Sequence, residues 1–179
     1  MQTSQPHDQW FALRVKSRHE KAVALAARGK GFEEFLPLYR WRQAWSDRSK
    51  WVEMPLFPGY VFCRLNPARR LPLLTIPGVL NFVCVGKTPI PIDGAEIASV
   101  QAAVQSELVT GPCSFIDSGR RVRLERGPLA GTEGILIEAA ERQQVVVNIT
   151  ILRRSIAVKV ETQWVEPLAF QMTAGNQPA

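Results

Sequence analysis

The sequence predicts an α+β domain at the N-terminus, an antiparallel sheet with helices, followed by a small all-β barrel. Up to about residue 107, the patterns run strand, helix, several antiparallel strands and helix, an order typical of a sheet with helices packed on one side. After residue 119 only short strand-like runs remain, and a closed barrel would leave few exposed edges. Between them, SELVTGPCSFIDSG has no hydrophobic period and reads as a linker. The expected divisions are an N-terminal domain at 8–107, a linker at 108–117, a barrel at 118–168 and a flexible tail at 169–179.

The first elements of the N-terminal domain follow from local patterns. WFALRVK (10–16) alternates apolar and polar residues as a strand does, and in the next segment Ser17 is a candidate cap for a helix ending near Gly29 or Gly31. FEEFLPLYRWRQAW and KWVEMPLF then predict a long hairpin with its turn near Asp47 and Ser49. Basic residues gather near its tip and are expected to be solvated: Arg40, Arg42, Arg48 and Lys50.

The octet PLFPGYVF (55–62) places two prolines and a glycine beside the most apolar strand, GYVFCRL. Proline cannot donate to a sheet ladder, so Pro55 and Pro58 fit where the chain enters the strand, and Gly59 allows it to turn into the sheet. VLNFVCV (79–85) predicts a further strand. Asp93 then caps a helix whose apolar residues share one face: Ile97, Val100, Ala103 and Val104.

The C-terminal part predicts about five short strands: RRVRLE, GILIEA, QQVVVNITIL, SIAVKVE and WVEPL. Alternation places on a common inner face Val145, Val147, Ile149 and Ile151, and likewise Ile156, Val158 and Val160. A tight turn between the first two strands holds Gly127, Gly131 and Gly134; Val122 and Leu124 point inward and Leu129 covers the turn.

Composition narrows the classes of function. The net charge of +6 is concentrated in residues 1–107, which hold 14 basic and 9 acidic residues, so a polyanionic partner would contact that part; a charge that merely aids solubility is the alternative. Three scattered cysteines and two histidines offer no zinc set, disulfide framework or catalytic group. We therefore expect no enzyme activity, metal or cofactor. With neither a membrane span nor a signal peptide in view, we expect a cytoplasmic protein. We also expect it to be a monomer.

Two sets of residues resemble a known family. V-R-L-x-x-G-P-L-x-G-x-x-G looks like the KOW motif, which certain ribosomal proteins share with the NusG (Spt5-type) transcription elongation factors. Lys50 with PLFPGYVF, WFALRV with the helix after it, and PGVLNFVCVGKTPIPI resemble the NusG N-terminal domain in matching order. The resemblance spans roughly residues 10–168. It implies a NusG N-terminal domain, an SH3-like KOW barrel and a bacterial transcription factor.

The resemblance also implies partners and sites. In this family an apolar depression grips the clamp helices of RNA polymerase, which suppresses pausing and termination. The matching residues are Phe57 and Tyr60 with Pro58, and possible contributors are Trp10, Phe62 and Phe82; from the residues alone, Phe62 and Phe82 fit a core better. Specialised members read the non-template DNA strand near the first strand and helix, where this chain carries Arg14, Lys16, Arg18, His19 and Lys21. A solvated helix start is the alternative for each of these.

One loop departs from the general factor. Where the general protein has Ile-Phe-Gly-Arg for contacts with Rho and the ribosome, this chain has Ile151, Leu152, Arg153 and Arg154. This loop and the PLFPxY strand are more similar to the specialised RfaH-like, polysaccharide-operon antiterminators, so we expect an operon-specific factor. The alternatives are a general NusG factor that couples to Rho or to a ribosomal protein, and a KOW-type RNA-binding or ribosome-associated module.

Overall fold

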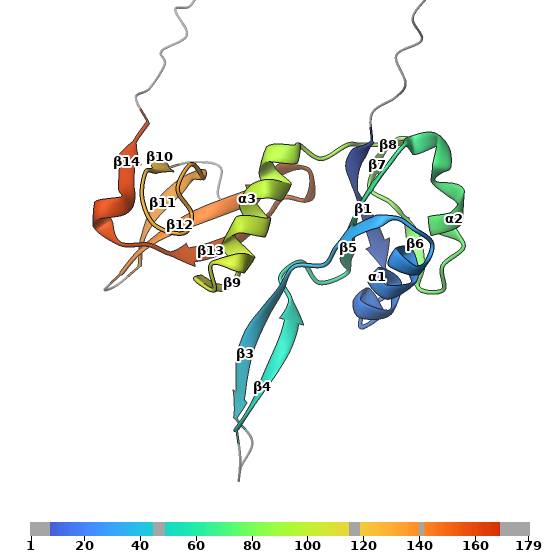
Figure 1. Cartoon of the computed structure of the whole chain (residues 1–179), viewed down its shortest axis with the longest axis horizontal. Helices are drawn as coiled ribbons and strands as arrows, with labels where there is room; N and C mark the ends of the chain where they lie inside the picture. The colour runs from blue at the N-terminus through green and yellow to red at the C-terminus, as the bar shows by residue number, and fades with distance from the viewer. Residues whose placement is uncertain (1–7, 45–48, 115–118, 140–141, 169–179) are drawn as a thin grey trace, which may run out of the picture.

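The computed structural model of the chain describes residues 8–44, 49–114, 119–139 and 142–168. An α+β part is followed by an all-β part, as the sequence predicts (Figure 1). The elements of the first part are β1 (Gln9–Val15), α1 (Glu20–Gly29), β2 (Glu33–Phe35), β3 (Leu38–Ala44), β4 (Ser49–Pro55), β5 (Tyr60–Leu65), η1 (Pro67–Arg69), α2 (Leu71–Leu74), β6 (Val79–Phe82), β7 (Cys84–Val85), β8 (Thr88–Pro89) and α3 (Gly94–Gln105).

The N-terminal sheet has the strand order β2-β5-β1-β6 and is antiparallel throughout. Alternation along β1 sends Phe11 and Leu13 into one buried cluster, which they share with α1, α2 and Phe82. Ala12 between them belongs to a second cluster with Phe62 and residues of α3. The sheet is therefore buried on both faces, and the short turn before β5 lies beside the second cluster.

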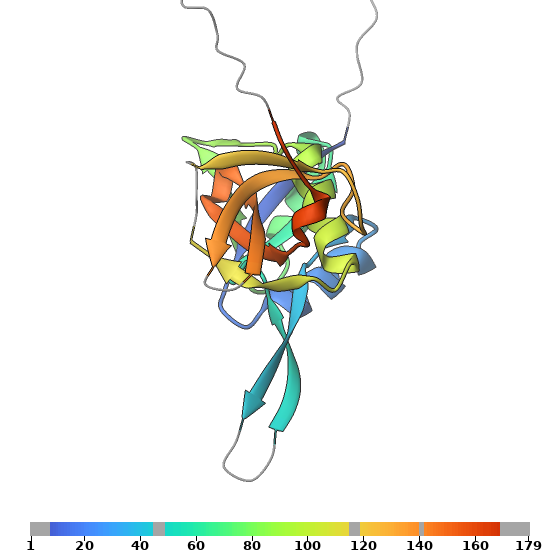
Figure 2. The ribbon, with the colours of Figure 1, turned by 90° about the vertical axis from the view of Figure 1, so that its left-hand side faces the viewer.

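Strands β3 and β4 form a separate two-stranded hairpin that projects from the body of the molecule in both views (Figures 1 and 2). The long hairpin predicted from the sequence is confirmed. Its tip, with the predicted turn at Asp47 and with Arg48, lies outside the described residues. Several large apolar side chains of the hairpin are exposed: Trp41, Trp51 and Met54.

The C-terminal domain is one antiparallel sheet in the order β14-β10-β11-β12-β13-β9, and it curls strongly (Figure 2). Its elements are β9 (Val109–Cys113), β10 (Arg120–Leu124), β11 (Glu133–Ala139), β12 (Arg142–Ile149), η2 (Thr150–Leu152), β13 (Arg154–Lys159), η3 (Thr162–Trp164) and β14 (Val165–Pro167). The five predicted strands are all present, and they bury the predicted inner face: Val122, Leu124, Leu129, Val145, Val147, Ile149, Ile156 and Val158. Ile151 departs from the prediction, because β12 ends at Ile149 and Ile151 lies in η2. Val160 also departs from it, because β13 ends at Lys159 and Val160 is half-buried.

The predicted linker at 108–117 is wrong over Val109–Cys113, which is the sixth strand of the sheet. This strand, β9, pairs with β13 from Val109↔Val158 to Cys113↔Ser155, with a register shift next to Val158. Gly111 and Pro112 break the strand pattern in the sequence. Both are tolerated in the outermost strand of a sheet, where the N–H that proline lacks needs no partner strand. Residues 115–118 of the predicted linker lie outside the described residues.

Helix α3 connects the two domains. It contacts β1 on one side and β12 on the other, and its buried residues Ile97 and Val100 belong to one continuous apolar cluster that also holds Phe57 and Ile149. A second contact joins the hairpin to β9, where the ring of Tyr39 packs against the backbone of Gly111. Among the described residues, no helix is long and apolar enough to cross a membrane.

Candidate functional site at the FPGY turn

The chain reverses direction between β4 and β5 in a tight turn made of Phe57, Pro58, Gly59 and Tyr60, here called the FPGY turn. The Tyr60 amide donates to the Phe57 carbonyl at 3.1 Å, and Gly59 has a φ of 83°. Proline at the second position and a glycine with positive φ at the third are the signature of a type II β-turn. The unusual punctuation of PLFPGYVF therefore encodes one defined turn at the entrance to a central strand.

The FPGY turn is anchored on both sides by hydrogen bonds. The Leu56 amide donates to the Pro37 carbonyl at 2.9 Å just before the turn, and the Val15 amide donates to the Gly59 carbonyl at 2.9 Å. The Gly59 amide donates to the Glu20 carboxylate at 2.8 Å. Glu20 is only 5% exposed. The start of α1 thus holds the turn against the end of β1.

Aromatic rings support the turn from below. Phe57 is 1% exposed and packs edge-on against Phe62, with ring centroids 5.5 Å apart; Phe62 stacks on Phe35, which meets Trp10. Tyr60 and Trp10 are half-buried and Pro58 is exposed. Of the residues expected at this surface, Phe57 and Phe62 are buried beneath it, whereas Pro58, Tyr60 and Trp10 are accessible.

Phe82 does not lie at this surface. It is 4% exposed and packs in the cluster on the opposite face of the sheet, edge-on to Phe11 at 6.1 Å. It lies across from Leu13 in the β1–β6 ladder, and Leu13 points to that same face. The prediction that Phe82 contributes to the polymerase-binding surface is therefore wrong, because Phe82 is a core residue.

The basic residues from the end of β1 to the start of α1 are solvent-exposed at every predicted position: Arg14, Lys16, Arg18, His19 and Lys21. The expected cap at Ser17 is wrong, because α1 begins at Glu20 and His19 occupies the N-cap position. The His19 ring nitrogen Nδ1 lies 3.0 Å from the Ser17 carbonyl oxygen, and the Lys16 amide donates to the Gly78 carbonyl at 2.8 Å. These bonds give the segment a fixed backbone next to the FPGY turn.

The turn between β10 and β11 is as tight as its glycines predict. The Gly131 amide donates to the Leu124 carbonyl at 2.6 Å, and the ring of Trp164 lies 2.8 Å from the place that a Cβ on Gly127 would take. A Cβ on Gly134 would lie 2.6 Å from the carbonyl oxygen of Val146 on the neighbouring strand. Packing alone therefore explains why positions 127 and 134 hold glycine, since no side chain fits at either one.

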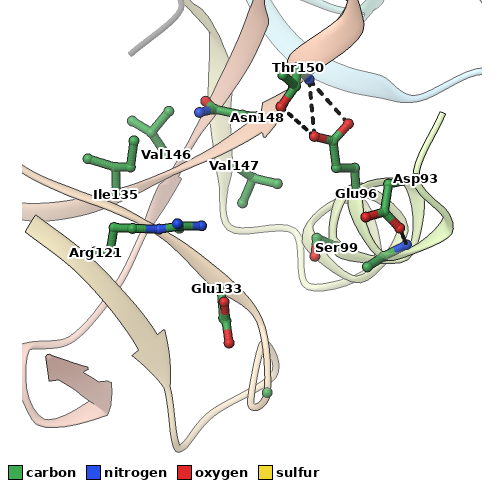
Figure 3. A pocket seen from close by; sticks show the side chains of 13 residues that line it. Asp93, Glu96, Ser99, Arg121, Glu133, Ile135, Val146, Val147, Asn148 and Thr150 are labelled. Carbon is green, nitrogen blue, oxygen red and sulfur yellow. Dashed lines mark hydrogen bonds between the residues drawn. The ribbon is translucent and has the colours of Figure 1, made fainter. Parts of the chain in front are cut away.

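The loop that carries Ile151, Leu152, Arg153 and Arg154 joins β12 to β13 and lies beside α3. Glu96 of α3 accepts hydrogen bonds from the backbone amide of Thr150, at 3.2 and 3.1 Å to its two oxygens, and from the Thr150 hydroxyl (Figure 3). Arg153 adopts a left-handed conformation with φ 47°. The N-terminal domain therefore holds the start of this loop.

Sequence reasoning missed Glu20 and Glu96. An acidic residue in the first turn of a helix is ordinary, since it faces the positive end of the helix dipole. The partners of these two carboxylates, Gly59 and Thr150, lie 39 and 54 positions away. No local pattern could have indicated them.

Comparison with known proteins agrees with this architecture. A family model described as "Transcription termination factor nusG" matches residues 8–101. The "Transcription termination/antitermination protein NusG" of Campylobacter jejuni is 26% identical over 171 residues, which cover 89% of this chain and 97% of that protein. The protein of the same description from Helicobacter pylori strain J99 is 26% identical over 125 residues, 68% of this chain and 71% of that one.

A solved structure, "Domain interaction in Thermotoga maritima NusG", is similar in fold, with a TM-score of 0.54, 23% identity, and coverage of 90% of this chain and 98% of that one. The family model by itself spans more than half of the chain, and its match includes β1, α1 and the FPGY turn. The chain therefore belongs to the NusG family of transcription termination and antitermination factors.

Proposed function

We propose that this protein binds the clamp helices of RNA polymerase through the FPGY surface, meaning Pro58, Tyr60 and Trp10 supported by Phe57 and Phe62, and thereby suppresses pausing and termination. The observation that carries the proposal is the accessible Tyr60 and Pro58 on a turn fixed from both sides. A half-buried tyrosine whose ring packs on an apolar cluster suits an interface that is apolar at its centre and wet at its rim.

The proposed action needs no chemistry. A factor that binds the closed form of a clamp more tightly than the open form shifts the population toward the closed form by that difference in affinity. Apolar burial supplies about 25 cal/mol per Å² before the costs of association. A rigid turn lowers those costs, because the contact residues are ordered before the partner arrives.

We further propose that the factor acts on a few operons rather than on most genes. The support is the loop Ile151 to Arg154, which replaces the general Ile-Phe-Gly-Arg. Arg153 occupies the glycine position and keeps a left-handed backbone, φ 47°, so the loop can retain a glycine-like shape while a cationic side chain replaces hydrogen and Leu152 replaces the aromatic ring. Such a change alters partner choice without unfolding the domain.

A general role is the second candidate, because the curated relatives from Campylobacter and Helicobacter are named as NusG without further specialisation. Coupling to Rho or to a ribosomal protein through the C-terminal domain would belong to that role. Contact of Arg14, Lys16, Arg18, His19 and Lys21 with the non-template strand belongs to the specialised one. Both roles use the same FPGY surface.

The test is a map of the protein's DNA occupancy compared with that of polymerase, together with binding of purified polymerase. Tyr60→Ala should abolish the polymerase-linked signal, and Tyr60→Phe should retain most of it. Leu25→Ala, which removes another exposed apolar side chain elsewhere on the domain, is the matched control. Signal on a few long operons supports specialisation, and signal on nearly all genes supports the general role.

Absence of a polymerase signal, with RNA bound instead, would overturn the proposal in favour of an RNA-binding module. Salt separates the two in vitro. Binding through an apolar surface survives moderate salt, whereas binding driven by phosphates weakens steeply as salt rises.

A further inference from the structure

A cleft of about 420 Å³ lies between α1 and the β3–β4 hairpin. One residue of α1 and five of the hairpin line it: Lys21, Arg40, Lys50, Trp51, Val52 and Glu53. Three of these carry a positive charge and one a negative charge, so the described lining is cationic. None of the residues of the FPGY surface lines this cleft. Of the residues predicted above to contact nucleic acid, Lys21 alone lines it.

Trp51 is the largest side chain of the cleft and is 65% exposed. Its exposed indole on a projecting ribbon offers a large flat apolar face that a partner can cover. In the hairpin register Trp51 lies opposite Arg42 and Arg40 lies opposite Glu53, so alternation puts all four on one face of the ribbon. A flat aromatic face is thus flanked by guanidinium groups.

The charges of the cleft are available to an anion. Glu53 pairs with Lys21 at 3.5 Å, and both side chains are more than half exposed. An exposed pair of this kind is weak and screened by salt, so a phosphate can compete for the ammonium group. Arg40 is exposed on the same face of the hairpin as Trp51, whereas Lys50, opposite Gln43, lies on the other face. An exposed aromatic face with cations around it is the arrangement that binds single strands, by stacking on bases and neutralising the backbone.

We propose that this cleft binds an unpaired nucleotide of single-stranded nucleic acid, with its base stacked on Trp51 and its phosphates held by Arg40 and Lys21. An acidic peptide would satisfy the cations but would leave the indole face without a planar partner. The inference deepens the nucleic-acid contact of the proposed function, and extends it from the start of α1 to the hairpin.

The test uses the full chain without polymerase and a labelled oligothymidine of about 12 nucleotides, a length within the range that single-strand-binding surfaces cover. Fluorescence anisotropy should show that Trp51→Ala weakens binding roughly tenfold and that Trp51→Phe, which keeps a stacking face, restores most of it. Arg40→Ala should weaken binding and reduce its dependence on salt. Trp41→Ala is the matched control, because Trp41 is 55% exposed on the same hairpin but is not part of the cleft lining.

The proposal is overturned if Trp51→Ala binds the oligonucleotide as Trp41→Ala does, if a duplex of the same length binds as tightly as the single strand, or if a poly-glutamate peptide displaces the strand at equal charge. Failure of the polymerase proposal is distinguishable from these results. Tyr60→Ala should leave oligonucleotide binding unchanged, and Trp51→Ala should leave polymerase binding unchanged in the absence of nucleic acid.

Discussion

Replacing Glu20 with alanine removes the acceptor of the Gly59 amide and should loosen the FPGY turn. The bond measures 2.8 Å, and Glu20 is 5% exposed, so water cannot readily substitute. A part-buried amide left without an acceptor costs about 1–3 kcal/mol, and loss of the charge from the first turn of α1 adds up to about 1 kcal/mol. We expect a total near 2 kcal/mol, or a fall in Tm of about 10 °C for a domain of about 100 residues.

The assay should report on the bond itself as well as on stability. Hydrogen exchange of the Gly59 amide, followed by NMR, should accelerate strongly in Glu20→Ala. It should change less in Glu20→Gln, because the amide oxygen still accepts. Polymerase affinity should fall in the same order.

Asn66→Ala is the control for a lost side-chain acceptor elsewhere in the domain, since Asn66 accepts from the Ala68 amide at 2.9 Å. Its destabilisation should leave exchange at Gly59 unchanged. If Glu20→Ala leaves Gly59 protected, or if the glutamine variant is as damaged as the alanine variant, the anchoring role of this carboxylate is wrong.

Further expectations concern other parts of the chain. Gly134→Ala would place a Cβ 2.6 Å from a backbone carbonyl oxygen on β12, so the C-terminal domain should lose more than about 2 kcal/mol; unchanged urea denaturation would contradict the close strand approach. Burial raises the pKa of the Cys63 thiol to about 12, whereas Cys84 is exposed, so iodoacetamide at pH 8 should modify Cys84 first, and equal rates would refute the burial of Cys63. Glu96→Ala should raise hydrogen exchange at the Thr150 amide, and unaltered exchange would show that α3 does not hold the loop.

Local chemistry explains why much of the fold could be predicted. The FPGY turn needs only four adjacent residues, because proline fixes φ at the second position of a type II turn and glycine permits the positive φ at the third. The hairpin, the Asp93 cap and the inner face of the C-terminal sheet likewise depend on residues close in sequence. Asp93 accepts from the Ala95 amide at 2.9 Å, as a capping residue does.

The features that sequence reasoning missed depend on partners far along the chain. Strand β9 contains Gly111 and Pro112 and carries no strand pattern of its own, so only its pairing with β13 defines it. The face to which Phe82 points is set by its register with β1, which a four-residue strand does not reveal. The burial of Phe57 depends on the packing of the whole cluster around α3, and no periodicity in the octet indicates it.

The position of β9 also sets a mechanical limit. Helix α3 ends at Gln105 and β9 begins at Val109, so only residues 106–108 lie between a helix packed on the first sheet and a strand built into the second. The last of these is already bonded, because the Lys159 amide donates to the Leu108 carbonyl at 3.0 Å. Three residues reach at most about 10 Å when fully extended. The connection between the two domains is therefore too short for them to reorient independently. A larger separation would require β9 to leave the C-terminal sheet or α3 to leave the N-terminal sheet.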